Sequence, residues 1–272
     1  MRPFALLAAA LISLPLALSA QERPSTILVM DGSGSMWGQI DGVNKIVIAR
    51  EVVAELLSDF PEDEDLGLTV YGHRREGDCT DIETVVAPAP GTASQIIDAV
   101  NAINPRGRTP MTDAVVAAAE ALGYIDAPAR VILVSDGIET CNPDPCAAAR
   151  ALEEAGADFT AHVVGFDVPE ADALAQLQCI ADETGGLFLT AANAAELSAA
   201  LEQVAAAEPE PQPVAIAFEA VIGEGGPLIE DPVLWDIAPL PEGVTGTVEG
   251  NPLSYDLMPG DYTVSAYWTV LE

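Results

Sequence analysis

Three short polar segments carry the residue types that could hold a metal ion. The first, "DGSGS" at residues 31–35, directly follows the apolar run "ILVM". The second, "RGRTPMTDA", contains Thr109 and Thr112, and the third, "SDGIET", contains Asp136. All three offer hydroxyl and carboxylate oxygens and neither a thiolate nor an imidazole. A set of oxygen donors alone selects hard cations such as Mg²⁺, Ca²⁺ or Mn²⁺.

The spacing within these segments suits one small ion. Ser33 and Ser35 stand at alternate positions and can ligate directly, while the glycines beside them let the backbone approach closely. Asp31 and Asp136 would ligate the ion or hold its waters, and Thr109 would complete a shell of about six oxygens. Burying two carboxylates together without a cation would be costly, so an ion gives this set of residues a reason to exist.

The elements around these segments must bring them together. "STILVM" and "ARVILVS" are continuous apolar runs bounded by turn residues, which is typical of strands buried on both faces of a parallel sheet. "LGLTVYG", "FTAHVVGF" and "GLFLTA" are similar. "DIETVVAPA" follows "LGLTVYG" too closely for a crossover helix, which predicts an antiparallel edge strand.

Amphipathic segments separate these strands. They cover Asn44–Phe60, 92–103, 112–122, 144–156, 169–186 and 193–207. Strands alternating with helices predict a doubly wound α/β domain with a mostly parallel six-stranded sheet and one antiparallel edge strand. Ligands of such sheets bind beyond the carboxyl ends of the strands, where the first and third polar segments lie.

The two ends of the chain differ from its middle. Residues 1–20 combine Arg2, an apolar run and small residues, which indicates a removable secretory signal; the run is short for a membrane span of about 20 residues. Residues 21–207 would form the α/β domain and 208–213, "EPEPQP", a stiff linker. Residues 214–272, rich in turn residues and alternating runs, predict a small all-β module whose completeness stays open. We therefore expect an exported protein that does not insert into a membrane after removal of the signal.

The charge of the chain limits its partners. The formal net charge is −33, and 22 acidic residues but no Lys or Arg follow Arg150. A polyanion would be repelled by such a protein, which excludes nucleic acid and disfavours an anionic membrane surface. Half of the residues are hydrophobic, so the sequence nevertheless has the composition of a folded protein.

Four cysteines occur, at Cys79, Cys141, Cys146 and Cys179. In an exported chain two disulfides are favoured over free thiols, and three connectivities are possible. We favour Cys79–Cys141 with Cys146–Cys179, and the other two stay open. Neither histidine stands beside a cysteine in the sequence, which argues against a zinc site.

The order "DGSGS", then "RTPMTDA", then "VSDG" resembles the von Willebrand factor type A domain and its metal-ion-dependent adhesion site. That family has Asp-x-Ser-x-Ser, a separate Thr, and an Asp after the fourth strand. The matching residues here are Asp31, Ser33, Ser35, Thr109 and Asp136. Thr109 is preferred to Thr112 for its Thr-Pro context. The resemblance covers Ser25 to about Ala207, and "GDC", "ETC" and "LQCIA" are similar to exported bacterial members, which supports disulfides.

The resemblance implies how such a site works. In that family the ion keeps an open position that a carboxylate of the bound partner fills. We therefore expect a periplasmic or secreted bacterial protein that binds a protein partner through one divalent cation, with Mg²⁺ first and Ca²⁺ or Mn²⁺ as alternatives. Candidate partner contacts are Trp37, Arg106, Arg108 and Glu139. The alternative is a structural or accessory subunit of a cell-envelope assembly in which the ion only stabilises the loops.

Catalysis has weaker support in the sequence. A dinucleotide-binding loop would need Gly in place of Trp37, and the lysine of a phosphate-binding loop is missing. The Gly-x-Ser-x-Gly turn of a serine hydrolase does not occur around Ser33 or Ser35. Metal-dependent phosphatases and nucleases use more carboxylates, often with two metals. We expect no enzyme activity, and a hydrolase is the remaining enzymatic alternative.

Overall fold

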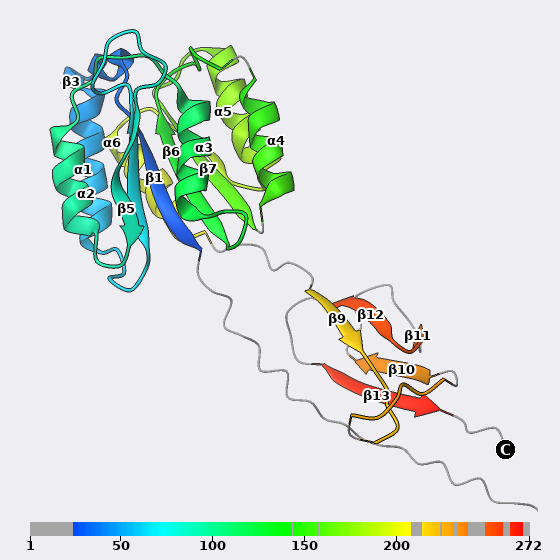
Figure 1. The fold of residues 1–272 in the computed structure, drawn as a ribbon. Coiled ribbons are helices and arrows are strands. Elements are labelled where there is room, and N and C mark those ends of the chain that lie inside the picture. The colour runs from blue at the N-terminus through cyan, green and yellow to red at the C-terminus, as the bar shows by residue number, and fades with distance from the viewer. Residues whose placement is uncertain are drawn as a thin grey trace, which may run out of the picture. The chain divides into compact units, whose positions relative to one another are not determined.

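The computed structural model describes residues 24–142, 144–156, 158–207, 214–223, 225–230, 233–238, 248–257 and 262–268. One compact unit spans Glu22–Glu208, and the C-terminal strands belong to another (Figure 1). The predicted signal at 1–20 and linker at 208–213 lie outside the described residues. Among the residues that the structure describes, none of the helices combines the length and apolar character that a membrane crossing requires.

A six-stranded sheet in the order β5-β4-β1-β6-β7-β8 forms the centre of the larger unit. Its strands are β1 (Ser25–Asp31), β4 (Leu66–Tyr71), β5 (Ile82–Ala89), β6 (Ala129–Ser135), β7 (Phe159–Phe166) and β8 (Phe188–Ala191). β5 pairs antiparallel with β4, and all other neighbours are parallel. The predicted doubly wound sheet with one antiparallel edge strand is therefore confirmed.

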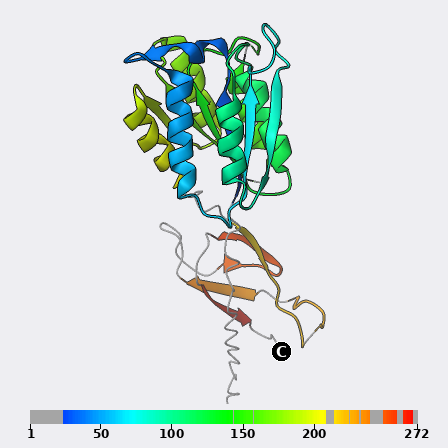
Figure 2. The ribbon, with the colours of Figure 1, turned by 90° about the vertical axis from the view of Figure 1, so that its left-hand side faces the viewer.

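Six helices cover the two faces of this sheet (Figures 1 and 2). On one face lie α1 (Lys45–Ser58), α2 (Ala93–Ala102) and α6 (Ala194–Ala205); on the other lie α3 (Met111–Leu122), α4 (Pro145–Ala155) and α5 (Ala171–Glu183). Alternate side chains of β1 serve both faces: Leu28 and Met30 pack with the first layer, and Ile27 and Val29 with the second. Burial on both faces explains why "ILVM" is continuously apolar.

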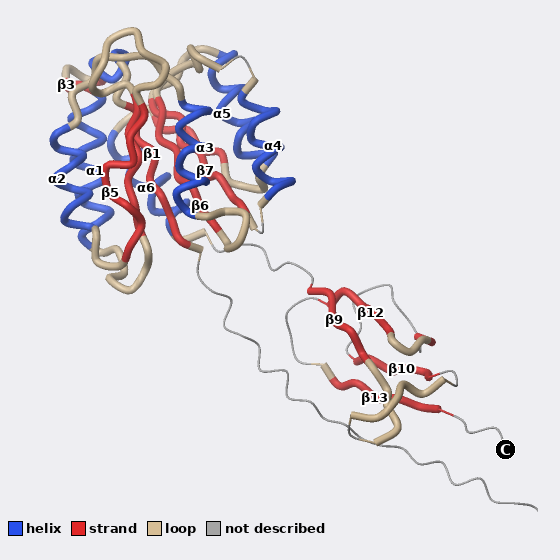
Figure 3. The backbone as a smooth tube through the Cα atoms, viewed as in Figure 1, coloured by secondary structure: helices blue, strands red, loops and turns tan. Residues whose placement is uncertain are grey.

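The chain passes from β1 to α1 through elements that the sequence did not predict. A 3₁₀ helix, Gly34–Trp37, is followed by a hairpin of β2 (Gln39–Ile40) and β3 (Val43–Asn44). Asp41 and Gly42 form its turn with positive φ angles of 51° and 85°. The 3₁₀ helix and the hairpin lie at the carboxyl ends of the parallel strands, at the top of Figure 3.

The C-terminal strands form two small antiparallel sheets. One contains β10 (Val233–Ala238), β11 (Val248–Glu249) and β13 (Thr263–Trp268), and the other contains β9 (Val214–Phe218) and β12 (Leu253–Leu257). Side chains of β10 alternate between buried and exposed, and Val233 and Trp235 pack with Phe218 in a small core. This arrangement agrees with the all-β character expected for this part of the chain.

His162 makes the larger unit sensitive to acid. This β7 residue is 6% exposed, and its Nδ1 accepts a hydrogen bond from the backbone N–H of Leu187 at 3.0 Å. Burial, followed by the charge of Arg130, lowers the pKa of His162 to about 4. The unfolded chain therefore binds more protons than the folded one between about pH 4 and the ordinary histidine pKa of about 6.5.

We expect the free energy of unfolding to fall as the pH drops from 6.5 to 4, by up to about 3 kcal/mol from this residue. His162→Asn should remove that part of the pH dependence, because its Oδ1 can accept the same hydrogen bond but does not titrate. Urea unfolding of both proteins at several pH values measures the difference. Identical pH profiles would show that His162 does not cause the loss.

Candidate metal centre

The first and third polar segments meet at the carboxyl edge of the sheet. β1 and β6 are parallel neighbours, so the residues that follow them emerge side by side. The Oγ of Ser35 donates a hydrogen bond to Oδ1 of Asp136 at 2.6 Å, and the hydroxyl oxygens of Ser33 and Ser35 are 2.8 Å apart. The winding of the sheet reverses at these strands, which is where open α/β sheets bind ligands.

Asp31 is completely buried and held by four donors. Its Oδ1 accepts from the backbone N–H of Ser33 at 2.7 Å, and its Oδ2 accepts from the hydroxyls of Tyr71 at 2.7 Å and Ser135 at 2.8 Å. The backbone N–H of Asp136 is a weaker fourth donor at 3.4 Å. Burial, followed by the charge of Asp31, raises the pKa of Tyr71 well above its ordinary value, so the phenol remains a donor.

Tyr71 and Ser135 were not predicted as site residues from the sequence. Tyr71 is the last residue of β4 and Ser135 the last residue of β6, and these strands flank β1. A signal was present in the sequence, because both hydroxyl-bearing residues end apolar runs next to the polar loops. Strand order was needed to recognise that both hydroxyls point to the same aspartate.

Asp136 is buried beside Asp31 and is only partly satisfied. Burial, followed by the charge of Asp31, raises the pKa of Asp136 to about 6, although the contacts with Ser35 and Lys45 oppose this shift. Its Oδ2 lies 3.2 Å from Nζ of Lys45 but has no hydrogen bond within the described residues. A buried carboxylate pair with an unsatisfied oxygen is the kind of site that a cation would stabilise.

The second polar segment lies directly against the first. Ser33 and Gly107 form a β-bridge, and the backbone N–H of Gly34 donates to the carbonyl of Gly107 at 3.1 Å. Gly72 permits this close packing: its φ is +65°, and a Cβ there would lie 2.4 Å from the carbonyl oxygen of Arg108. Thr109, which follows Arg108 in the sequence, is buried beside these packed loops.

Thr112, the other candidate, has a different environment. It is buried and lines a small gap between α3, α4 and α5 together with Val115 and Pro145. Its hydroxyl has no hydrogen-bond partner within the described part of the chain. Thr112 thus lies among the helices, whereas the loop of Thr109 adjoins Ser33, and Thr109 stays the predicted metal ligand.

The donor set fits a hard cation that depends on hydroxyls. The described residues contain no group of three or more His, Cys, Asp or Glu side chains that could hold a metal. Two carboxylates and two serine hydroxyls do converge, with a threonine on the adjoining loop. The residues that would hold the ion are Asp31, Ser33, Ser35, Thr109 and Asp136.

Three of the predicted partner contacts are exposed beside this centre. The side chain of Trp37 is 47% exposed, and its indole N–H donates to the carbonyl of Pro105 at 2.9 Å, which holds the ring in place. Arg106 and Arg108 are exposed on the same loop as Pro105. None of the ion pairs among the described residues involves either arginine, and Nη1 of Arg108 donates to the carbonyl of Thr140 at 3.4 Å.

Glu139, the fourth predicted partner contact, has a different environment from the other three. This residue is only 8% exposed, and its Oε2 accepts from the backbone N–H of Thr112 at 2.8 Å, at the start of α3. Its Oε1 accepts from the backbone N–H groups of Cys141 at 2.7 Å and Asn142 at 3.0 Å. Glu139 braces the β6–α4 loop against α3, because a carboxylate satisfies the unpaired N–H groups at a helix start.

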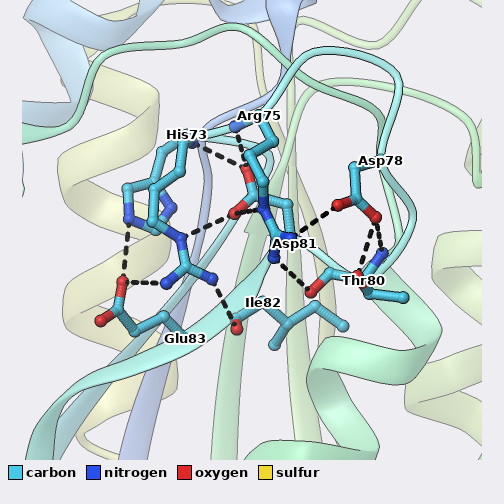
Figure 4. Close-up of polar contacts among 8 residues, drawn as sticks. His73, Arg75, Asp78, Thr80, Asp81, Ile82 and Glu83 are labelled. Atoms are coloured by element: carbon cyan, nitrogen blue, oxygen red, sulfur yellow. Dashed lines mark hydrogen bonds and ion pairs between the residues drawn. The ribbon is translucent and has the colours of Figure 1, made fainter.

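A polar cluster in the β4–β5 loop supports the same edge (Figure 4). Asp81 is buried and accepts from the backbone N–H groups of Arg74 at 2.7 Å and Arg75 at 2.8 Å. Burial alone would raise the pKa of Asp81, but these N–H groups and the guanidinium of Arg74 lower it overall. Arg74 also pairs with Glu83 at 2.8 Å. The arginines of this loop are thus neutralised locally.

Two disulfides join the loops and helices of this unit. Cys79 in the β4–β5 loop pairs with Cys141 in the β6–α4 loop, and Cys146 of α4 pairs with Cys179 of α5. This is the connectivity that the sequence analysis favoured. The first disulfide ties the Asp81 cluster to the segment that carries Asp136 and Glu139.

The fold and the arrangement of these loops define a class of protein. Residues 26–139 match the family described as von Willebrand factor type A domain. The chain is 28% identical over 209 residues to the Bacillus subtilis uncharacterized protein YwmD, covering 74% of this chain and 93% of that protein. It is 30% identical over 181 residues to the Bacillus subtilis uncharacterized protein YwmC, covering 63% and 78%. The chain therefore belongs to the von Willebrand factor type A family.

Solved structures have the same fold at low sequence identity. A von Willebrand factor type A protein from Catenulispora acidiphila matches with a TM-score of 0.58 and 17% identity over 91% of this chain and 58% of that chain. The pilus adhesin SpaC from Lactobacillus rhamnosus GG matches with a TM-score of 0.55 and 13% identity, over 90% of this chain and 39% of that chain. Proximal thread matrix protein 1 from the mussel byssus, solved with a zinc-occupied MIDAS motif, matches with a TM-score of 0.51 and 20% identity. The match covers 71% of this chain and 49% of that chain. This chain thus spans roughly half the length of these solved chains.

Proposed function

We propose that the protein is an exported bacterial binding protein that holds a protein partner through one divalent cation. The observation that carries this proposal is the convergence of two loops 101 residues apart, where Ser35 contacts Asp136 beside the buried Asp31. When bound, the ion would supply a positive charge and a coordination position for a carboxylate of the partner. Mg²⁺ suits this small set of carboxylate and hydroxyl oxygens, with Ca²⁺ and Mn²⁺ as alternatives.

The protein's own residues would prepare this centre before a ligand arrives. Tyr71 and Ser135 orient Asp31, and Ser35 orients Asp136, so that little rearrangement is needed on binding. The zinc-occupied site of the mussel protein supports metal binding by this fold. The abundance of hydroxyls over carboxylates favours ligand binding over activation of water.

The surface around the centre suits an acidic protein. A chain with a net charge of −33 repels acidic partners over most of its surface, but the cation, Arg106 and Arg108 would attract them at this edge. Trp37 adds a fixed aromatic side chain of the type that often dominates binding energy. Similarity to a pilus adhesin supports a role in adhesion, and the two disulfides support export to an oxidising compartment.

The test is capture of partners from the native cell envelope with the wild type and Asp31→Ala, in Mg²⁺ and in chelator. We expect a partner that is retained in Mg²⁺ and lost both in chelator and with Asp31→Ala. Glu51→Ala, which removes an exposed acid of α1, is the charge-matched control and should capture normally. If Asp31→Ala lowers the melting temperature but keeps every partner, the ion serves stability, and the accessory-subunit hypothesis replaces adhesion.

A further inference from the structure

The single lysine of the chain lies against the metal centre. Lys45 is the first residue of α1 and is 8% exposed. Its Nζ is 3.2 Å from Oδ2 of Asp136 and 3.1 Å from Oδ2 of Asp167, and it donates to the carbonyl of Asp167 at 2.9 Å. A buried ammonium therefore joins a metal-site carboxylate to the segment that follows β7.

Lys45 occupies a position that local structure does not favour. A cation at the start of a helix opposes the helix dipole, and burial of an ammonium group is costly unless it is paired. The neighbouring backbone nevertheless accommodates it: a Cβ at Gly38 would lie 3.3 Å from Cε of Lys45, so glycine leaves room for the lysine stem. The location is therefore explained by the carboxylates and not by the helix.

Asp167 shows the same adaptation on the other side of the ammonium. Its φ is 51°, in the left-handed region that non-glycine residues rarely adopt. Both its carboxylate and its carbonyl contact Lys45, and its backbone N–H donates to the carbonyl of Ala191 at 2.7 Å. These contacts hold Asp167 in place beside Lys45.

The two oxygens of Asp136 thus have different neighbours. Oδ1 is held by Ser35, on the side of the serine hydroxyls, whereas among the described residues Oδ2 forms its one ion pair with Nζ of Lys45. Without Lys45, Oδ2 would be a buried charged atom with no counter-charge, close to the carboxylate of Asp31. The carboxylate of Asp136 would then keep its contact with Ser35 but lose the positive charge that compensates this repulsion and fixes Oδ2.

We propose that Lys45 is a positioning residue of the metal centre, which holds Asp136 ready for the cation. The inference rests on the proposed function, because it assumes that Asp136 serves a bound ion. An ammonium that only repelled a nearby cation would weaken its binding instead. The sign of the change in cation affinity therefore decides whether Lys45 prepares the site or competes for it.

The test is calorimetric titration of the full chain, freed of metal by chelator, with MgCl₂. Lys45→Met should raise the Kd for Mg²⁺ at least tenfold, and Lys45→Arg should restore most of the affinity because it keeps the charge. Arg50→Met is the matched control: it removes a cation from the same helix, one that donates to the carbonyl of Ile103, and should leave the Kd unchanged.

The outcomes separate this inference from the proposed function. No cation uptake by the wild type would overturn both. Uptake by the wild type with equal or tighter binding by Lys45→Met would overturn the inference alone. The same holds if Lys45→Met lowers the melting temperature equally with and without Mg²⁺ and leaves the Kd unchanged. If Lys45→Met does not fold, Asp167→Asn keeps Lys45 and weakens its tether. That variant should raise the Kd by a few fold, and an unchanged Kd would overturn the inference.

Discussion

Replacing Asp136 by asparagine should abolish cation binding and leave the metal-free protein about as stable as the wild type. The substitution preserves the shape of the side chain and its contact with Ser35, but removes one of two buried carboxylates. Burial and the charge of Asp31 raise the pKa of Asp136 to about 6, so its charge is unfavourable before an ion binds. Removing this unfavourable buried charge offsets, in the free energy of unfolding, the loss of the ion pair with Lys45.

Calorimetry should show that Asp136→Asn weakens Mg²⁺ binding at least about 100-fold, equivalent to about 2.7 kcal/mol. Unfolding by urea in chelator should give a free energy of unfolding within about 1 kcal/mol of the wild type, a difference typical of mild substitutions. A large loss of Mg²⁺ binding with a nearly unchanged free energy of unfolding would show that Asp136 serves ligand binding and not the stability of the fold.

A charge-matched control is essential because a chain with a net charge of −33 attracts cations without any specific site. Asp144→Asn removes one negative charge at the start of α4, and asparagine can still accept the capping hydrogen bond from the backbone N–H of Ala147. This control should bind Mg²⁺ normally. Equal weakening by both substitutions would indicate diffuse attraction, and normal binding by Asp136→Asn would place the ion elsewhere.

The sequence predicted the sheet well because its signals are local. A strand buried on both faces must be apolar at every position, and "ILVM" in β1 is such a strand. The antiparallel edge followed from a connection too short for a helix, between Tyr71 and Ile82. The hairpin at 39–44 escaped prediction because each of its strands has only two residues.

The surroundings of the candidate metal centre depended on contacts that sequence alone does not specify. Tyr71 is 40 residues from Asp31, and Lys45 is 122 residues from Asp167. Glu139 illustrates the same limit. An acid in a polar loop was interpreted as a ligand contact, but its role depends on the N-terminus of α3 lying beside it. Residue types at strand ends could be located from the sequence, whereas their neighbours required the order of the strands.

The two disulfides should differ in their effect on cation binding, although both should stabilise the fold. They close segments with sequence separations of 62 and 33 residues, and removal of a native disulfide typically costs about 2–5 kcal/mol. Cys79–Cys141 holds the loop in which Glu139 contacts α3 and Thr140 donates to the carbonyl of Thr109 at 3.1 Å. Cys146–Cys179 joins two helices of the outer layer.

We therefore expect the double substitution Cys79→Ala and Cys141→Ala to raise the Kd for Mg²⁺ at least about tenfold, or about 1.4 kcal/mol, because it releases the loops that carry Thr109 and Asp136. Cys146→Ala with Cys179→Ala should lower the free energy of unfolding without changing the Kd. Calorimetry and urea unfolding of both double variants measure these quantities under conditions where each is folded. Equal loss of affinity in both would mean that cation binding follows global stability, and that the first disulfide has no particular role in holding the metal centre.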